Sequence, residues 1–196
     1  MKTQNRNERQ AKRAFTLIEM IGVLAVIAIL AALLIPKIFE AINNARINNA
    51  LVSYNTVKTA CMDHYAKYGG IDRTTNGASI TVPINSYDQV LLSEGFLDKP
   101  FLVKVGTNSF VHVVNGAGVT YNLDGSTNGV NSVAGATYVV EAIIQGVPAG
   151  DAKDISDRLD AAQGPLLAPT PPADDTTGRV KYSNTVQTVW IYVTHR

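Results

Sequence analysis

Residues 15–36 read FTLIEMIGVLAVIAILAALLIP, and this stretch governs how the rest of the chain is interpreted. Between Met20 and Ile35 it contains no charged and no strongly polar residue. A helix of this length spans about 33 Å, which is close to the hydrocarbon thickness of a bilayer. The stretch therefore predicts a membrane-spanning helix.

Charge is distributed unevenly on the two sides of the apolar stretch. Residues 1–14 carry five basic side chains and one acidic one, whereas the rest of the chain carries 12 basic and 15 acidic groups. Basic flanking residues stay cytoplasmic, so we expect everything after Pro36 on the outer side. The overall net charge of +1 excludes a strongly basic nucleic-acid binder, and the single cysteine, Cys61, excludes an internal disulfide framework.

One acidic residue, Glu19, lies near the start of the apolar stretch. A carboxylate at membrane depth costs a few kcal/mol unless it has a partner or lies near the interface. Three interpretations compete. The stretch could be a cleaved secretory signal peptide, although it has no strict A-x-A site. It could be a plain single-pass anchor whose Glu19 reaches the membrane surface. In the third interpretation, Glu19 has a specific role.

The residues KRAFTLIEMIGVLAVIAILAALLIP, positions 12–36, resemble the prepilin signature of type IV pilins and of the pseudopilins of type II secretion systems. The resemblance implies that a prepilin peptidase cuts between Ala14 and Phe15, removes the leader 1–14, and methylates the new N-terminus at Phe15. Pro36 matches a proline that the family often has near the end of this segment. Ala14 departs from the family pattern, in which glycine usually precedes the cut.

The resemblance also implies an assembly mechanism. The new amine of Phe15 would pair with Glu19 of a neighbouring subunit, because a buried charge is tolerable when paired and costly when alone. The chain would then be a structural subunit, not an enzyme, in a type IV pilus-like or type II secretion pseudopilus filament. Its partners would be other pilin-like subunits, the prepilin peptidase/methyltransferase and an inner-membrane assembly platform.

The same resemblance implies a location and leaves an alternative. The leader would be cytoplasmic and the head periplasmic, with the subunit later extracted from the inner membrane into a periplasmic or extracellular filament. Alternatively, the chain is a membrane-tethered periplasmic binding module that uses the helix only as an anchor.

Residues 37–68 continue in a helical pattern. Apolar residues recur at three- and four-residue spacing, which predicts an amphipathic helix that holds a globular head. These residues are Ile47, Ala50, Leu51, Tyr54, Val57, Cys61, Tyr65 and Tyr68. Pro36 removes one helical hydrogen bond and is expected to kink the helix. We interpret Cys61 as a small packed hydrophobe, not as a nucleophile with His64 as its base.

Residues 69–196 are expected to form a small α+β head with an antiparallel sheet against the long helix, a pilin-like outline. Strands are predicted at 80–84, 109–114, 118–123, 137–144, 179–182 and 186–194. Ser86 and Gln89 form a capping-box pattern for a short helix, and Asp151 is expected to cap a second one. The acids Asp151, Asp154, Asp157 and Asp160 are expected to form a solvated helix face, and 163–178 a surface loop.

The segment DGSTNG, residues 124–129, is a candidate calcium site. Asp124, Ser126 and Asn128 place oxygen-bearing side chains at alternating positions, which is how a calcium loop begins. Position twelve of such a loop would be Gly135, so the bidentate glutamate is missing. A tight turn rich in Asn and Gly is the competing interpretation.

Overall fold

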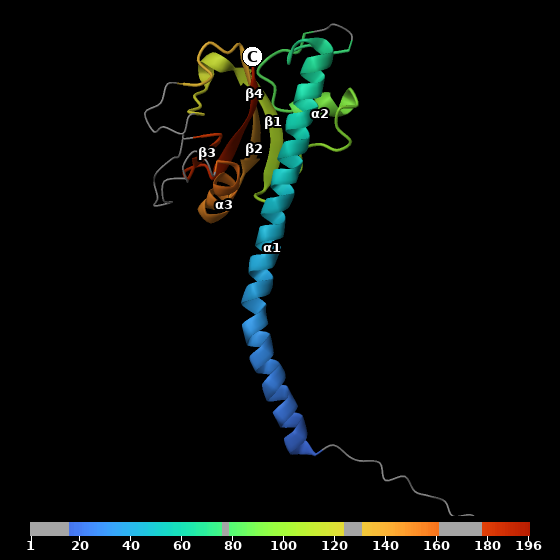
Figure 1. Cartoon of the computed structure of the whole chain (residues 1–196), viewed down its shortest axis with the longest axis vertical. Coiled ribbons are helices and arrows are strands. Elements are labelled where there is room, and N and C mark those ends of the chain that lie inside the picture. The colour runs from blue at the N-terminus through green and yellow to red at the C-terminus, as the bar shows by residue number, and fades with distance from the viewer. Residues whose placement is uncertain (1–15, 76–78, 124–130, 161–177) are drawn as a thin grey trace, which may run out of the picture. The chain divides into compact units, whose positions relative to one another are not determined.

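The computed structural model describes residues 16–75, 79–123, 131–160 and 178–196. The chain divides into two units between Asn43 and Asn44, and helix α1 (Leu17–Tyr68) contributes to both. The other elements belong to the second unit (Figure 1): α2 (Tyr87–Ser93), β1 (Asn108–Asn115), the 3-10 turn η1 (Gly116–Gly118), β2 (Tyr138–Gln145), α3 (Ala149–Leu159), β3 (Val180–Ser183) and β4 (Thr188–His195).

In the first unit, α1 exposes large apolar side chains on every side. Leu17 is 78% exposed, Leu33 69% and Phe39 67%, and similar side chains continue to Ile42. The most apolar part of α1 has a mean hydropathy of 2.8, and none of it is buried within the chain. By length and composition this helix can cross a membrane. An apolar surface all round a helix also needs a covering, which the described residues do not provide.

In the second unit, the described residues form a four-stranded antiparallel sheet in the order β1-β2-β4-β3. The strands agree with the predictions at 109–114, 137–144, 179–182 and 186–194, with bounds shifted by one or two residues. The register places Phe110 opposite Ile143 and Ile143 opposite Trp190, and a β-bulge interrupts β2 between Val140 and Glu141. The α+β layout expected from the sequence is confirmed.

The main core lies between the sheet and the second half of α1. Ile47, Tyr54 and Val57 are no more than 2% exposed and pack with inward-facing residues of the sheet. The Tyr54 hydroxyl donates a hydrogen bond to the backbone oxygen of Tyr192 at 2.7 Å, which ties the helix directly to β4. One correction concerns the helix face: the buried side chain after Cys61 is His64, whereas Tyr65 is 43% exposed.

Two predicted strands do not form among the described residues. At 80–84, only Ile84 exchanges backbone bonds with a strand residue, Val113, since Pro83 has no N–H to continue a ladder. At 118–123, the backbone of Val119 and Tyr121 bonds to the side chain of Asn131 instead of to a neighbouring strand.

Both helices are present and Ser86 is the N-cap residue of α2, but neither predicted side-chain capping bond forms. The Ser86 side chain makes no capping bond, and Asp88 instead turns inward to accept the backbone N–H groups of Phe101 and Val111. Helix α3 begins at Ala149 after Pro148, so Asp151 lies in its first turn and is not the cap.

The acids of α3 do not form a uniformly solvated face. Asp160 is only 2% exposed and accepts hydrogen bonds from the backbone N–H groups of Arg179 and Val180, at 3.0 and 2.9 Å. These bonds fix the start of β3 against the end of α3, on either side of the segment 161–177.

Candidate functional site

The start of α1 carries a reciprocal set of hydrogen bonds between Thr16 and Glu19. The Glu19 carboxylate accepts the Thr16 backbone N–H at 2.9 Å and the Thr16 hydroxyl at 2.7 Å. The Thr16 hydroxyl oxygen in turn accepts the Glu19 backbone N–H at 3.3 Å. This is a capping box, which satisfies backbone donors that the first helical turn leaves without partners.

The capping box directs the Glu19 carboxylate back toward the N-terminal end of the helix. A carboxylate is also electrostatically favoured there, because the helix dipole is positive at that end. The sequence analysis missed Thr16. The spacing of Thr16 and Glu19 in FTLIE is the T-x-x-E pattern of a capping box, so the signal was present.

The other predicted functional residues fall in different parts of the chain. Pro36 lies inside α1, which runs through it as one helix. Ala14 and Phe15 lie outside the described residues, and so do Asp124, Ser126 and Asn128. Cleavage and methylation at the first pair, and a calcium site at the other three, therefore stay predictions. In the described part of the chain, no group of three His, Cys, Asp or Glu side chains could hold a metal ion.

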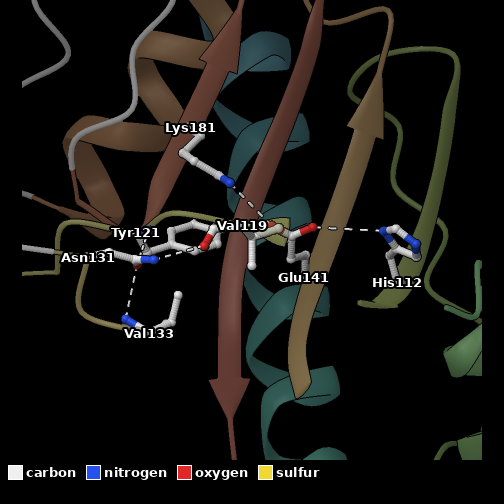
Figure 2. A network of polar contacts seen from close by, with 7 residues as sticks. All are labelled: His112, Val119, Tyr121, Asn131, Val133, Glu141 and Lys181. Atoms are coloured by element: carbon white, nitrogen blue, oxygen red, sulfur yellow. Dashed lines mark hydrogen bonds and ion pairs between the residues drawn. The ribbon is translucent and has the colours of Figure 1, made fainter. Parts of the chain in front are cut away.

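A second polar cluster lies in the head around Glu141 of β2 (Figure 2). Glu141 is 2% exposed, and its Oε1 accepts the Tyr121 hydroxyl at 2.6 Å and the Lys181 amine at 3.3 Å. Its Oε2 lies 3.8 Å from Nδ1 of His112. The Lys181 amine also lies 3.8 Å from the centre of the Tyr121 ring. The contacts of Glu141 thus join β1, β2, β3 and the segment after η1.

The charges in this cluster compensate one another. Burial alone would raise the pKa of Glu141, but His112, the Lys181 charge and the Tyr121 hydroxyl together hold that pKa below its usual range. Burial likewise lowers the pKa of Lys181, which the Glu141 carboxylate opposes. The buried carboxylate is thus compensated by its partners, and the removal of one partner would leave the others buried without compensation.

Asn131, which follows the segment 124–130 in the sequence, bonds the backbone around Tyr121 of this cluster. Its Oδ1 accepts the backbone N–H groups of Tyr121 and Val133, and its Nδ2 donates to the Val119 carbonyl oxygen. The Asn131 contacts, visible at the left of Figure 2, hold the two ends of this segment together. Tyr121, Val133 and Val139 then form a small second core on the outer face of the sheet.

Cys61 is not a reactive thiol. It is 1% exposed, and burial raises the pKa of its thiol to about 12. The thiolate that nucleophilic chemistry requires is therefore disfavoured at neutral pH. This agrees with the interpretation of Cys61 as a packed hydrophobe.

Comparison with known proteins locates one match, at the N-terminus. A family model described as "Prokaryotic N-terminal methylation motif" matches residues 9–35. Neither the curated proteins nor the solved structures yielded a match. The matched residues include the predicted cleavage site at Ala14 and Phe15, Glu19 and almost all of the apolar stretch. Residues 9–35 therefore carry the prepilin-type N-terminal methylation signature of type IV pilins and pseudopilins.

Proposed function

We propose that this protein is a structural subunit of a filament of the type IV pilus or type II secretion pseudopilus kind. The observation that carries the proposal is the methylation motif at 9–35, on a helix that exposes apolar side chains on every side. A membrane could cover this surface before assembly, and the helices of other subunits could cover it afterwards. A helix that served only as an anchor would not need a methylation motif.

In this proposal Glu19 changes partners during assembly. In the single subunit its carboxylate is satisfied by Thr16 of the same chain, which lowers the cost of placing it in the membrane. After the leader is removed, the amine of Phe15 from an adjoining subunit provides a full positive charge. A charged partner is stronger than a neutral one, so the exchange favours the filament.

The test is to remove the Glu19 charge while keeping its shape. Glu19→Gln should leave membrane insertion and leader cleavage normal. A hydrogen bond to a charged group is worth about 1.5–3 kcal/mol, so filament yield should fall about tenfold or more. Yield is measured as sheared or pelleted polymer relative to total subunit.

Glu40→Gln is the matched control. Glu40 pairs with Lys37 at 3.0 Å, and both side chains are largely exposed, so the same substitution there should leave yield unchanged. If Glu19→Gln formed polymer as well as the parent chain, Glu19 would not be the assembly charge. If the parent chain formed no polymer in its own cell and retained residues 1–14, the tethered binding module would be favoured instead.

A further inference from the structure

The end of α1 and the segment that follows it meet around a buried imidazole, His64. Its side chain is 0% exposed, and the rings of Tyr68, Tyr87 and Phe96 contact it edge-on. Each of its two ring nitrogens also faces a polar side chain from the part of the chain that follows α1. Because a buried imidazole must satisfy both nitrogens, its partners constrain where its protons can lie.

Two side chains near α2 provide these partners. The Tyr87 hydroxyl lies 3.0 Å from Nδ1 of His64 and also 3.0 Å from the backbone oxygen of Ile71. Oε2 of Glu94 lies 3.2 Å from Nε2 of His64, while Oε1 accepts the backbone N–H of Thr75 at 3.0 Å. Nε2 and Oε2 are both buried, and among the described residues neither forms a hydrogen bond of good geometry, so the two atoms face each other only at ion-pair distance.

The Tyr87 hydroxyl has a single proton for its two neighbours. If it donates to the Ile71 carbonyl, Nδ1 of His64 must donate to the Tyr87 oxygen. Nε2 must then carry a proton as well, because a lone pair there would face the Glu94 carboxylate. The imidazole is charged in this arrangement. If the hydroxyl donates to Nδ1 instead, the imidazole is neutral and its one proton is on Nε2.

We propose that His64 is a proton-operated switch that moves the Tyr87 hydrogen bond between two acceptors. When His64 is neutral, Tyr87 donates to its Nδ1. On acidification one proton from solvent binds Nδ1, the Tyr87 hydroxyl turns to the Ile71 carbonyl, and His64 forms an ion pair with Glu94. Ile71 lies three residues after the end of α1, so the switch sets how the chain at Ile71 is tied to the helix.

The surrounding groups place the switch on the acid side of neutrality. Burial lowers the pKa of His64, the Glu94 carboxylate and the Arg73 backbone oppose this, and Lys67 lowers the pKa further. Asp72 and Cys61 face the neighbouring Tyr87. Because the folded-state pKa lies below the ordinary value of 6.5, stability that is present above that pH is lost as the pH falls through the folded pKa.

The test uses the full chain in detergent micelles with 15N at histidine. At about pH 8, the nitrogen shifts of His64 should show a neutral ring with its proton on Nε2, and both nitrogens should be protonated in acid. Amide exchange across residues 72–80 should change with the same midpoint. A neutral His64 with its proton on Nδ1 at the higher pH would overturn the proposal.

Variants separate the switch from a simple change in packing. Glu94→Gln keeps the shape but removes the negative charge, so the His64 midpoint should fall by about one pH unit. Tyr87→Phe should leave His64 titrating while the backbone signals around Ile71 lose their pH dependence. His112→Gln alters a histidine that faces Glu141 and should leave the His64 midpoint unchanged. An unchanged midpoint in Glu94→Gln would contradict the ion pair.

Discussion

At the scale of single residues, buried polar side chains in the head are matched to specific partners. Glu141 binds Tyr121 and Lys181, and Asp160 binds the backbone at the start of β3. Removing one partner of such a pair leaves the other buried without compensation, which costs more than the pair itself contributes. A conservative substitution at one of these residues should therefore lower the free energy of unfolding of the head more than a substitution at an exposed pair.

Glu141→Gln should lower the free energy of unfolding of the head by about 2–3 kcal/mol, because it leaves the Lys181 amine without a carboxylate. The measurement is chemical unfolding of the full chain in detergent, followed by the fluorescence of Trp190. Asp157→Asn breaks a pair with Lys153 whose side chains are each 37% exposed, and should change stability by less than about 1 kcal/mol. Equal losses of unfolding free energy in the two variants would contradict the distinction between a buried and a partly exposed ion pair.

The same variant tests the pH dependence of the cluster. The pKa of Glu141 is below its ordinary value of 4.5, so its contribution is complete above that pH. The contribution disappears as the pH falls through the folded-state pKa. The stability difference between the parent chain and Glu141→Gln should therefore be constant near neutrality and shrink in acid below pH 4.5. A difference that did not depend on pH would exclude an ionised Glu141.

At the scale of elements, α1 presents two kinds of surface in succession. Up to Ile42 it exposes apolar side chains all round, whereas from Ile47 onward one face is buried against the sheet. The Tyr54–Tyr192 hydrogen bond and the contact of Arg46 with the Lys104 carbonyl fix this second part within the head. Its side chains should thus contribute to stability according to the face on which they lie.

Ile47→Ala and Val52→Ala form a matched pair on the same helix. Ile47 is 0% exposed, so its truncation should cost about 3 kcal/mol of unfolding free energy through lost burial and the cavity that remains. Val52 is 64% exposed, and its truncation should change stability by less than about 0.5 kcal/mol. Denaturant midpoints of the two variants decide the comparison. Similar losses would mean that α1 does not pack on the sheet by this face.

At the scale of the whole molecule, the proposed function assigns the N-terminal residues 1–14, the apolar helix and the head to successive steps of one process. Residues 9–35 carry the prepilin-type methylation motif, which supports processing by a prepilin peptidase. The apolar surface of α1 up to Ile42 is left uncovered by the described residues and so needs a covering. The head folds around its own core, which begins at Ile47.

Intact-mass analysis of the chain from its native cell tests this order of steps. We expect a mass that lacks residues 1–14 and includes one added methyl group, because the methylation motif at 9–35 implies cleavage before Phe15 and methylation of the new N-terminus. Ala14→Gly restores the residue that the family usually has before the cut and should be processed at least as fast. A chain that kept its leader would support the tether, and one cut after residue 36 would support a secreted protein.

The membrane-spanning character and the motif of the N-terminal part of this protein could be predicted from the sequence alone. The leader charge, Glu19 and the apolar run are consecutive in the chain, and their meaning follows from local spacing and the length of a helix. The four strands and three α-helices seen among the described residues were also predicted, because alternation and helical periodicity are local signals.

Only the tertiary structure decided the partners of the buried polar groups. Asp160 could not be distinguished from the other acids of this segment, since the backbone N–H groups that donate to it lie about 20 positions further along the chain. Glu141 likewise forms its hydrogen bond with a residue that is distant in the sequence, Tyr121. Asn131 bonds the backbone of Val119 and Tyr121, where the composition had favoured a strand at 118–123. The physical reason is that hydrogen-bond satisfaction in an interior is a property of the folded chain, whereas hydrophobic period is a property of each segment.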